Sequence, residues 1–303
     1  MKTACTAGPS CPVDERRDTI GSKGQEGESY STTFTLALLL WCDTPHDKRM
    51  NDIEALALAA ELAQQAASII MTIRSRGFDV IHKSDHSPVT EADHAAEKAI
   101  LAGLRAATPQ WPVVAEEEVA AGLMTAPADT FWLVDPLDGT REFTAGTRDF
   151  TVNVGLIRHG RPVLGAVALP AYGELFLGIS GQGAWKRDAD GERPIHVRTP
   201  PAEGLTVMAS RHYADDPRLA EFLGQRKVAA LSNIGSAAKF CRLAEGEADL
   251  YPRLGRTMEW DTAAPQAVLE AAGGSVLTFD GQMLGYGKPG WENPHFICTG
   301  AHG

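Results

Sequence analysis

The chain has few cysteines and too little basic charge for several common classes of protein. Its five cysteines are scattered, and none belongs to a C-x-x-C pair. Neither a zinc site nor a disulfide framework is therefore expected, and a reducing cytoplasm is the simpler location. The 28 basic residues are outnumbered by 39 acidic ones, which gives a formal net charge of −11. This balance argues against a nucleic-acid polymer or an anionic membrane surface as partner, whereas a small anionic substrate would need local cations.

Long apolar runs are also lacking. Residues 34–42 form the only run that resembles a targeting segment, and it falls far short of the roughly 20 residues that a membrane helix needs. It lies behind a long stretch of mixed charge, unlike a signal peptide. We expect no integral membrane segment. Residues 1–49 are rich in Gly, Ser, Thr and mixed charges, which predicts a disordered or loosely packed N-terminal extension. Whether this extension belongs to the native protein is left open.

The remaining chain begins with two predicted helices. Asn51 and Glu54 have the spacing of a capping box, an apolar face that includes Ile53 follows, and Gly77 ends the helix. Thr90 is expected to open a second helix that runs to about residue 107. These helices belong to an expected α+β half.

Strands dominate the rest of this half. Short turns between predicted strands at 150–158, 162–169 and 174–178 indicate an antiparallel meander, and a hydrophilic loop is expected at 187–194. Beyond it, strands alternate with helices, which is typical of an α/β arrangement. The predicted domains are therefore residues 50–200, an α+β metal-binding half, and residues 201–303, an α/β substrate-binding half.

Acidic residues stand at the ends of several predicted elements. Five of them follow strands or open a helix: Glu116, Glu117, Asp135, Asp138 and Asp261. Two carboxylates at short range repel each other unless a positive charge neutralises them. Mg²⁺ prefers oxygen ligands of this kind. Taken alone, each residue has an ordinary explanation as a turn former, a solvated charge or a helix cap, but their conjunction favours a metal site.

The stretch D-P-L-D-G-T at 135–140 has a backbone suited to such a site. It can aim both carboxylates and the carbonyl of Leu137 into one cavity, because Pro136 restricts the turn and Gly139 relieves it.

Several segments together resemble a known family. The resemblance to the lithium-sensitive inositol monophosphatase superfamily rests on V-A-E-E-E-V-A-A-G at 114–122, W-L-V-D-P-L-D-G-T at 132–140 and E-W-D-T-A-A at 259–264. A more specific resemblance, to 3′(2′),5′-bisphosphate nucleotidases of the CysQ type, rests on K-S-D-H-S-P-V-T-E-A-D at 83–93 and G-S-A-A-K-F-C-R-L-A-E-G-E-A-D-L-Y-P-R at 235–253. It covers residues 51–299 and implies an α/β fold, the layered αβαβα sandwich of the inositol monophosphatase and fructose-bisphosphatase type.

The resemblance implies two Mg²⁺ ions, with a third, weaker one in several relatives. The implied ligands are Glu116, Glu117, Asp135, the carbonyl of Leu137, Asp138 and Asp261, with Asp135 shared between two ions. Two ions about 3.5–4 Å apart bind the attacking and leaving oxygens of an in-line displacement. Thr140, with Asp93 behind it, matches the pair that orients and deprotonates the attacking water, and Glu116 is the third implied catalytic residue.

The predicted substrate contacts fall into two groups. Those at the metal site are Glu116, Leu137, Asp138, Gly139, Thr140 and Asp261. Those in the second half are Ser210, Arg211, Gly235, Ser236, Lys239 and Arg253, with Arg256 as a further candidate. Gly235 and Ser236 would open a helix whose free N–H groups bind phosphate, and the arginines would grip a second phosphate.

Two features depart from the family pattern. Pro265 is expected in the first turn of the helix that contains Asp261, where relatives often carry Gly. The loop TAGTRD at 144–149 differs from the form expected of bacterial nucleotidases, and it is expected to border the substrate. Substrate preference is therefore left open.

The expected activity is Mg²⁺-dependent hydrolysis of the 3′-phosphate of adenosine 3′,5′-bisphosphate to AMP and phosphate, as in sulfate assimilation, with inhibition by Li⁺. Two alternatives remain. One is an inositol-phosphate or sugar-phosphate phosphatase with the same metals, and the other is a non-catalytic module that binds metal or nucleotide. The sequence does not indicate an oligomeric state.

Overall fold

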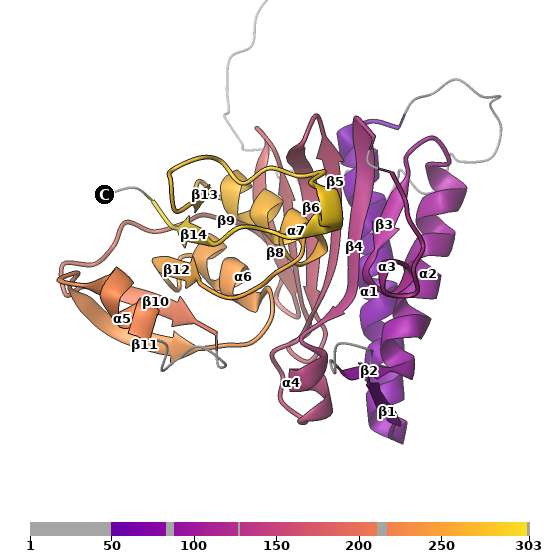
Figure 1. Cartoon of the computed structure of the whole chain (residues 1–303), viewed down its shortest axis with the longest axis horizontal. Coiled ribbons are helices and arrows are strands. Elements are labelled where there is room, and N and C mark those ends of the chain that lie inside the picture. Colours follow the sequence, from indigo (N-terminus) through magenta and orange to yellow (C-terminus); the bar gives the residue numbers. More distant parts are fainter. Residues whose placement is uncertain (1–49, 83–87, 127, 211–216, 302–303) are drawn as a thin grey trace, which may run out of the picture. The chain divides into compact units, whose positions relative to one another are not determined.

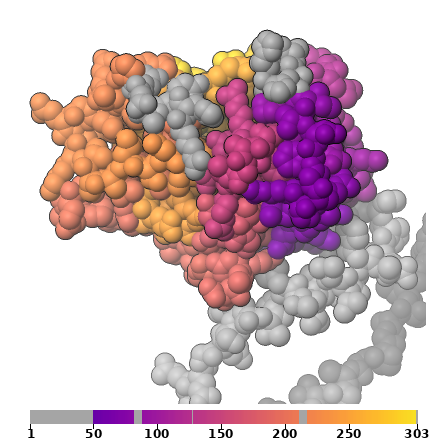
Figure 2. Space-filling model, turned by 90° about the horizontal axis from the view of Figure 1, so that it is seen from below, coloured from indigo at the N-terminus to yellow at the C-terminus, as the bar shows by residue number. Residues whose placement is uncertain are grey.

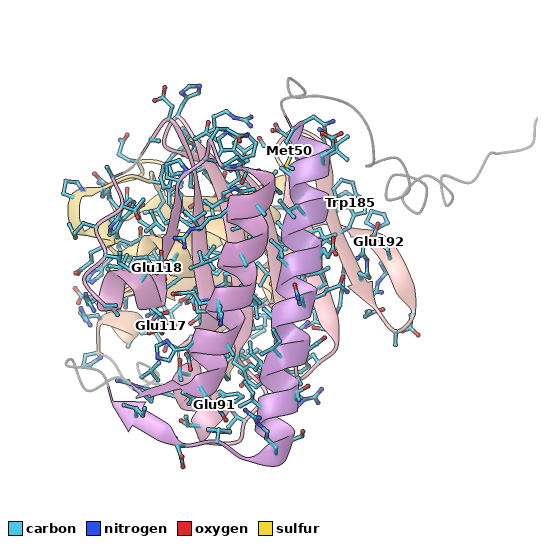
Figure 3. The ribbon with its side chains drawn as sticks, turned by 90° about the vertical axis from the view of Figure 1, so that its right-hand side faces the viewer. Met50, Glu91, Glu117, Glu118, Trp185 and Glu192 are labelled. Atoms are coloured by element: carbon cyan, nitrogen blue, oxygen red, sulfur yellow. The ribbon has the colours of Figure 1, made fainter. Side chains whose placement is uncertain are left out.

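Two long helices run side by side along one face of the main sheet (Figure 1, Figure 3). The computed structural model describes residues 50–301 apart from 83–87, 127 and 211–216, so the predicted N-terminal extension and Arg211 lie outside the described residues. The helices are α1 (Asp52–Arg76) and α2 (Glu91–Ala107), and the short strands β1 (Val80–His82) and β2 (Pro88–Thr90) pair between them.

Both helices begin with the predicted caps. Asn51 and Glu54 exchange reciprocal hydrogen bonds of 2.9 Å at the start of α1. Thr90 and Asp93 do the same at the start of α2. Ile53 does not join the buried face of α1 as expected, since its side chain is 50% exposed. In length and composition α1 could cross a membrane, but its apolar side chains pack against α2 and the sheet as part of the core.

The main sheet has seven strands in sequence order. They are β3 (Val113–Ala115), β4 (Thr130–Asp138), β5 (Thr151–Arg158), β6 (Arg161–Leu169), β7 (Glu174–Ile179), β8 (Gly183–Asp188) and β9 (Gly191–Ile195). Strands β3 and β4 are parallel and the others pair antiparallel, so the predicted meander is confirmed. The loop expected at 187–194 is wrong, because β8 and β9 form a hairpin there. Its polar residues are opposite charges paired across the strands, as between Arg187 and Glu192.

The second sheet has five strands in the order β11-β10-β12-β14-β13. Their bounds are β10 (Leu205–Ala209), β11 (Val228–Asn233), β12 (Leu250–Arg253), β13 (Ser275–Thr278) and β14 (Phe296–Thr299). Strand β10 runs parallel to both β11 and β12, whereas β14 is antiparallel to both its neighbours. Strand β14 was not predicted, since it is short and follows a stretch rich in Gly and Pro.

The remaining helices complete the layers. They are α3 (Glu116–Ala120), α4 (Thr140–Thr144), α5 (Pro217–Leu223), α6 (Ala238–Ala244), α7 (Glu259–Ala271) and the 3₁₀ turn η3 (Pro289–Trp291). Helices α6 and α7 lie between the two sheets (Figure 1). In β10, Met208 packs with α6 whereas Ala209 packs with Leu219 of α5. Because neighbouring residues of a strand face opposite ways, α5 covers the far side of the second sheet. The predicted layered sandwich is confirmed.

The two sheets divide close to the predicted boundary. The first sheet ends at Ile195 and the second begins at Leu205. Helix α7, however, lies between β12 and β13 of the second sheet in sequence, yet it packs on the first sheet. A division into separate domains at residue 200 therefore stays a prediction.

A row of glycines lets α7 lie directly on the first sheet. Gly155, Gly165 and Gly178 are paired across β5, β6 and β7. A Cβ atom at these positions would lie 2.7, 2.2 and 2.5 Å from backbone atoms of α7. Any larger residue would push α7 away from the sheet. This row of glycines therefore sets the distance between the sheet and α7, including its first turn.

Gly165→Ala should therefore destabilise the protein. The added methyl meets the carbonyl oxygen of Ala264, which is backbone and cannot rotate away. We expect a loss of about 1–3 kcal/mol in the free energy of unfolding, typical of an overpacked core. Gly285→Ala is the matched control, because its Cβ would lie 3.8 Å from the nearest atom outside its own neighbourhood. Equal stability of the two variants by denaturant unfolding would contradict this role of the glycine row.

Candidate active site

A β-bulge in β4 turns Asp135 and Asp138 to the same face of the sheet. Residues three apart on a regular strand point to opposite faces. Here Asp135 pairs with Asn153 and Asp138 pairs with Thr151, so three steps on β4 match two on β5. One extra residue changes the alternation, and both carboxylates face the side covered by α7. The expected turn at 135–140 is thus a bulged strand end.

Backbone N–H groups hold these carboxylates by one oxygen each. Leu137 donates to Oδ1 of Asp135 at 3.0 Å, and Ala237 donates to Oδ2 of Asp138 at 2.6 Å. Asp261, the third residue of α7, accepts from the N–H of Met258 at 2.9 Å. Among the described residues, the second oxygen of each carboxylate has no hydrogen-bond partner. Each aspartate is therefore oriented yet keeps one oxygen available for a ligand.

The glutamates of α3 lie at the neighbouring strand end. Strand β3 runs parallel to β4, and Ala115 lies beside Val134. The next residue of each chain segment, Glu116 after β3 and Asp135 in β4, therefore lies at the same end of the sheet. Glu117 is buried, whereas Glu118 pairs with Arg105 at 2.6 Å. Both glutamates are labelled at the start of α3 in Figure 3.

Glu97 also belongs to this region, although the sequence did not predict it. Its carboxylate is 5% exposed and accepts from the N–H groups of Glu117 and Glu118 at 2.8 and 3.0 Å. It therefore caps α3 and fixes where the glutamates point. Burial raises its pKa to about 7. The available signal was its position four residues after Asp93, on the same face of α2.

Burial and mutual repulsion raise the pKa values of the clustered aspartates. The pKa of Asp135 lies well above its ordinary range, because of burial and the nearby Glu116, Asp138 and Asp261. Burial, followed by the charge of Asp138, raises the pKa of Asp261 to about 8. Burial raises the pKa of Asp138 to about 6, although Lys239 opposes the shift. The fully ionised form of the cluster is therefore unfavourable unless a positive charge neutralises it.

Thr140 and Asp93 meet beside this cluster. The hydroxyl of Thr140 lies 3.0 Å from Oδ1 of Asp93 and 3.1 Å from the carbonyl of Leu137. The other oxygen of Asp93 accepts from the N–H and hydroxyl of Thr90. Asp93 is 1% exposed, and burial raises its pKa. The capping and catalytic interpretations of Asp93 are thus compatible, since one oxygen serves each.

Gly139 occupies a position that only glycine fits. It has φ +91°, and a Cβ would lie 3.0 Å from the carbonyl oxygen of Asp149 and 3.3 Å from the side chain of Ser236. The loop at 144–149 therefore passes directly over the start of α4. Seen from below, α4 faces the viewer between α1 and the C-terminal half (Figure 1, Figure 2).

The loop before α6 is held differently from the expectation. The helix begins at Ala238, two residues after Ser236, and the N–H of Ala237 already binds Asp138. Lys239 is 2% exposed and donates to the carbonyls of Ile234 and Ser236 at 3.0 and 2.6 Å. Burial lowers its pKa to about 8. In this structure Lys239 braces the loop from inside, and direct contact with substrate stays a prediction.

A buried ion-pair network fixes α6 to the first sheet. Lys186 of β8 lies 2.7 Å from both Glu174 of β7 and Glu245, and Arg242 of α6 lies 2.8 Å from Glu174. The network holds α6 and the loop that precedes it against the sheet. The amide that binds Asp138 is thereby tied to the strands that carry the other carboxylates.

Ser210 and Arg253 line one crevice at the ends of β10 and β12. A small cavity of about 10 Å³ lies between them, with Leu219 and Leu254 among its walls. The chain passes from β10 to its neighbour β11 and then returns to β12 on the other side of β10, and such a change of direction is the usual place for ligands in open α/β sheets. The guanidinium of Arg253 donates to the carbonyls of Gly255 and Arg256. Its positive charge also acts on Asp138 and Asp261.

Other predicted features lie elsewhere. Arg256 pairs with Glu292 at 3.1 Å on the surface. Pro265 is the seventh residue of α7, so its expected place in the first turn is wrong, because the helix begins at Glu259. A larger cavity, of about 390 Å³, lies beside β13 and residues 284–289 and holds none of the predicted site residues.

The residues at the strand ends fit a hydrated divalent cation. Within the described residues, no three His, Cys, Asp or Glu side chains form a closed metal-binding group. Mg²⁺ needs no such group, since it keeps several waters and binds through few carboxylates. The available oxygens of Asp135, Asp138 and Asp261 suit such an ion, and their raised pKa values show the repulsion that it would relieve.

Without Mg²⁺, the free energy of unfolding should fall as pH rises. Asp138 and Asp261 keep protons to about pH 6 and 8 in the folded protein, but to near 3.8 when unfolded. Their contribution is therefore fully present below about pH 4 and lost by about pH 8. Saturating Mg²⁺ should flatten this slope. Denaturant unfolding between about pH 4 and 8, once with EDTA and once with Mg²⁺, measures how the free energy of unfolding changes with pH. The same pH dependence in both conditions would contradict a cation site here.

Comparison with known proteins identifies the family of this chain. The model of the inositol monophosphatase family matches residues 52–300. The chain is 42% identical over 239 residues to the 3′(2′),5′-bisphosphate nucleotidase CysQ of Escherichia coli (strain K12), covering 78% of this chain and 96% of that protein. The crystal structure of CysQ from Bacteroides thetaiotaomicron superposes with a TM-score of 0.71 at 31% identity, over 84% of this chain and 100% of that one. The chain therefore belongs to the inositol monophosphatase family.

Proposed function

We propose that the protein is a Mg²⁺-dependent 3′(2′),5′-bisphosphate nucleotidase, which releases the 3′-phosphate of adenosine 3′,5′-bisphosphate to give AMP. Several relatives that bear this name are 38–42% identical to the chain, and members of the family are metal-dependent phosphatases. The observation that carries the proposal is the hydroxyl–carboxylate pair of Thr140 and Asp93 beside the crowded carboxylates. Two ions, with Asp135 shared between them, would fit the ligand set.

The chain's own residues would divide the work of hydrolysis. When bound, Mg²⁺ supplies positive charge that stabilises the attacking and leaving oxygens of the displacement. Thr140 donates its proton to Asp93, so its lone pairs can accept a hydrogen bond from the attacking water. Asp93 would receive the proton of that water through Thr140, and its raised pKa makes it a better base. Glu116 would orient the same water.

Side chains at the ends of β10 and β12 would contact the second phosphate of the substrate. A bisphosphate nucleotide carries a second phosphate that inositol 1-phosphate lacks. Arg253 and Ser210 offer a guanidinium and a hydroxyl beside one another, which suits a phosphate oxygen. This local cation offsets the net charge of −11 where the substrate would enter. An inositol-phosphate phosphatase remains the alternative that the substrate test decides.

Phosphate release from two substrates with Mg²⁺ tests the activity. We expect a much higher kcat/KM for adenosine 3′,5′-bisphosphate than for inositol 1-phosphate. Asp138→Asn should lower kcat by at least about a hundred-fold, since it removes a charge that acts through the cation. Circular dichroism should show the fold of this variant unchanged. Preference for inositol 1-phosphate would overturn the substrate, and unchanged turnover by the variant would overturn the metal chemistry.

Arg253→Gln should weaken recognition of the second phosphate. Losing a charged hydrogen bond lowers kcat/KM for adenosine 3′,5′-bisphosphate by about ten- to a hundred-fold. Turnover of adenosine 3′-monophosphate, which lacks that phosphate, should change little. Arg256→Gln is the matched control, because Arg256 pairs with Glu292 at the surface. Equal losses on both nucleotides would contradict the assignment.

A further inference from the structure

The buried polar atoms that lack a hydrogen bond gather around the carboxylates. Within the described residues, five buried side-chain atoms have no partner: Oγ1 of Thr151, Nδ2 and Oδ1 of Asn153, Oγ1 of Thr257 and Oδ1 of Asn293. Thr257 and Asn293 adjoin the start of α7, where the side chain of Asn293 donates to the carbonyl of Met258. Thr151 and Asn153 belong to β5. Buried polar groups are almost always paired, so this concentration calls for a ligand.

Asn153 and Thr151 lie directly opposite two of the carboxylates. Asn153 pairs with Asp135, and Thr151 pairs with Asp138. Side chains of opposed residues in an antiparallel pair share a face, with Cβ atoms about 5 Å apart. Gly155, two residues further along β5, faces the backbone of α7. Because alternate residues of a strand share a face, Asn153 and Thr151 point to the same side as Asp135 and Asp138.

Both side chains are fully enclosed by protein. Each is 0% exposed, so bulk water does not satisfy them. Asn153 offers a donor and an acceptor, and neither has a partner. Leaving such groups unpaired costs about 1–3 kcal/mol each, which evolution rarely tolerates at two neighbouring positions. The waters of a hydrated cation held by the carboxylates would donate hydrogen bonds to the acceptor oxygens at this point.

We propose that Asn153 and Thr151 form a neutral hydrogen-bonding floor for the metal site, which would bind the water shell of a cation held by Asp135 and Asp138. This inference rests on the proposed function. Asn153 and Thr151 are positioning residues, since they act on the ion and on Asp135 and Asp138. Carrying no charge, they can orient the ion without adding to the repulsion among the carboxylates. Groups that orient a metal shell in this way tune its affinity.

Isosteric apolar variants separate this role from ordinary core packing. Asn153→Leu and Thr151→Val remove the unpaired groups and keep the volume. If their partners come only with the ion, the metal-free variants lose no hydrogen bond, so their Tm should stay equal to that of the wild type or rise. Thr108→Val is the matched control. Thr108 is also 0% exposed, but it donates to Leu104 at 2.7 Å and accepts from Trp132 at 3.0 Å.

Calorimetric titration with Mg²⁺ and thermal unfolding in EDTA test the proposal. We expect Asn153→Leu to weaken Mg²⁺ binding by about ten- to a hundred-fold, with a smaller loss for Thr151→Val. Thr108→Val should lower the metal-free Tm and leave the Mg²⁺ affinity unchanged. Wild-type affinity in Asn153→Leu, or a metal-free Tm that falls as in Thr108→Val, would overturn the proposal.

Turnover of adenosine 3′,5′-bisphosphate by the wild type is measured in the same series. Mg²⁺ binding that depends on Asn153, without turnover of the nucleotide, would support the floor and overturn the proposed activity. Turnover of the nucleotide, together with a Mg²⁺ affinity that the Asn153→Leu variant leaves unchanged, would support the activity and overturn the floor. The two proposals therefore fail separately.

Discussion

The close approach of α7 to the first sheet is the constraint on which the site depends. The paired glycines of β5, β6 and β7 leave no side chain between strand and helix, so the backbone of α7 lies on the sheet itself. Asp261 in the first turn is thereby carried to the strand end that bears Asp135. A helix held one side chain higher would leave the aspartate too far from the others to share a ligand.

Backbone N–H groups and two nearby cations both offset the resulting concentration of negative charge. Each aspartate is tied through one oxygen to an N–H group of a neighbouring turn, and Glu97 ties down the start of α3. The positive charges of Lys239 and Arg253 act to lower the pKa of Asp138. Burial and the remaining repulsion among the carboxylates still raise their pKa values.

Much of this could be predicted from the sequence where the signals are local. The capping boxes at Asn51 and Thr90 fix helix starts through residues three apart, and the meander follows from short turns between apolar runs. The hairpin of β8 and β9 was not predicted, because its residues are charged and resemble a solvated loop. The sequence of one segment does not show that these charges pair across two strands.

The sequence by itself determined which residues are available to the site, because motif spacing and the ends of predicted elements single out the carboxylates and Thr140. Only the tertiary structure decided how they meet. The bulge that turns Asp138 to the side of Asp135 depends on the register of β4 against β5. That register also places Asn153 beside Asp135 on the neighbouring strand, and the fold turns Lys239 inward to the loop carbonyls. Strand register and helix height arise from contacts between distant segments, which local patterns do not specify.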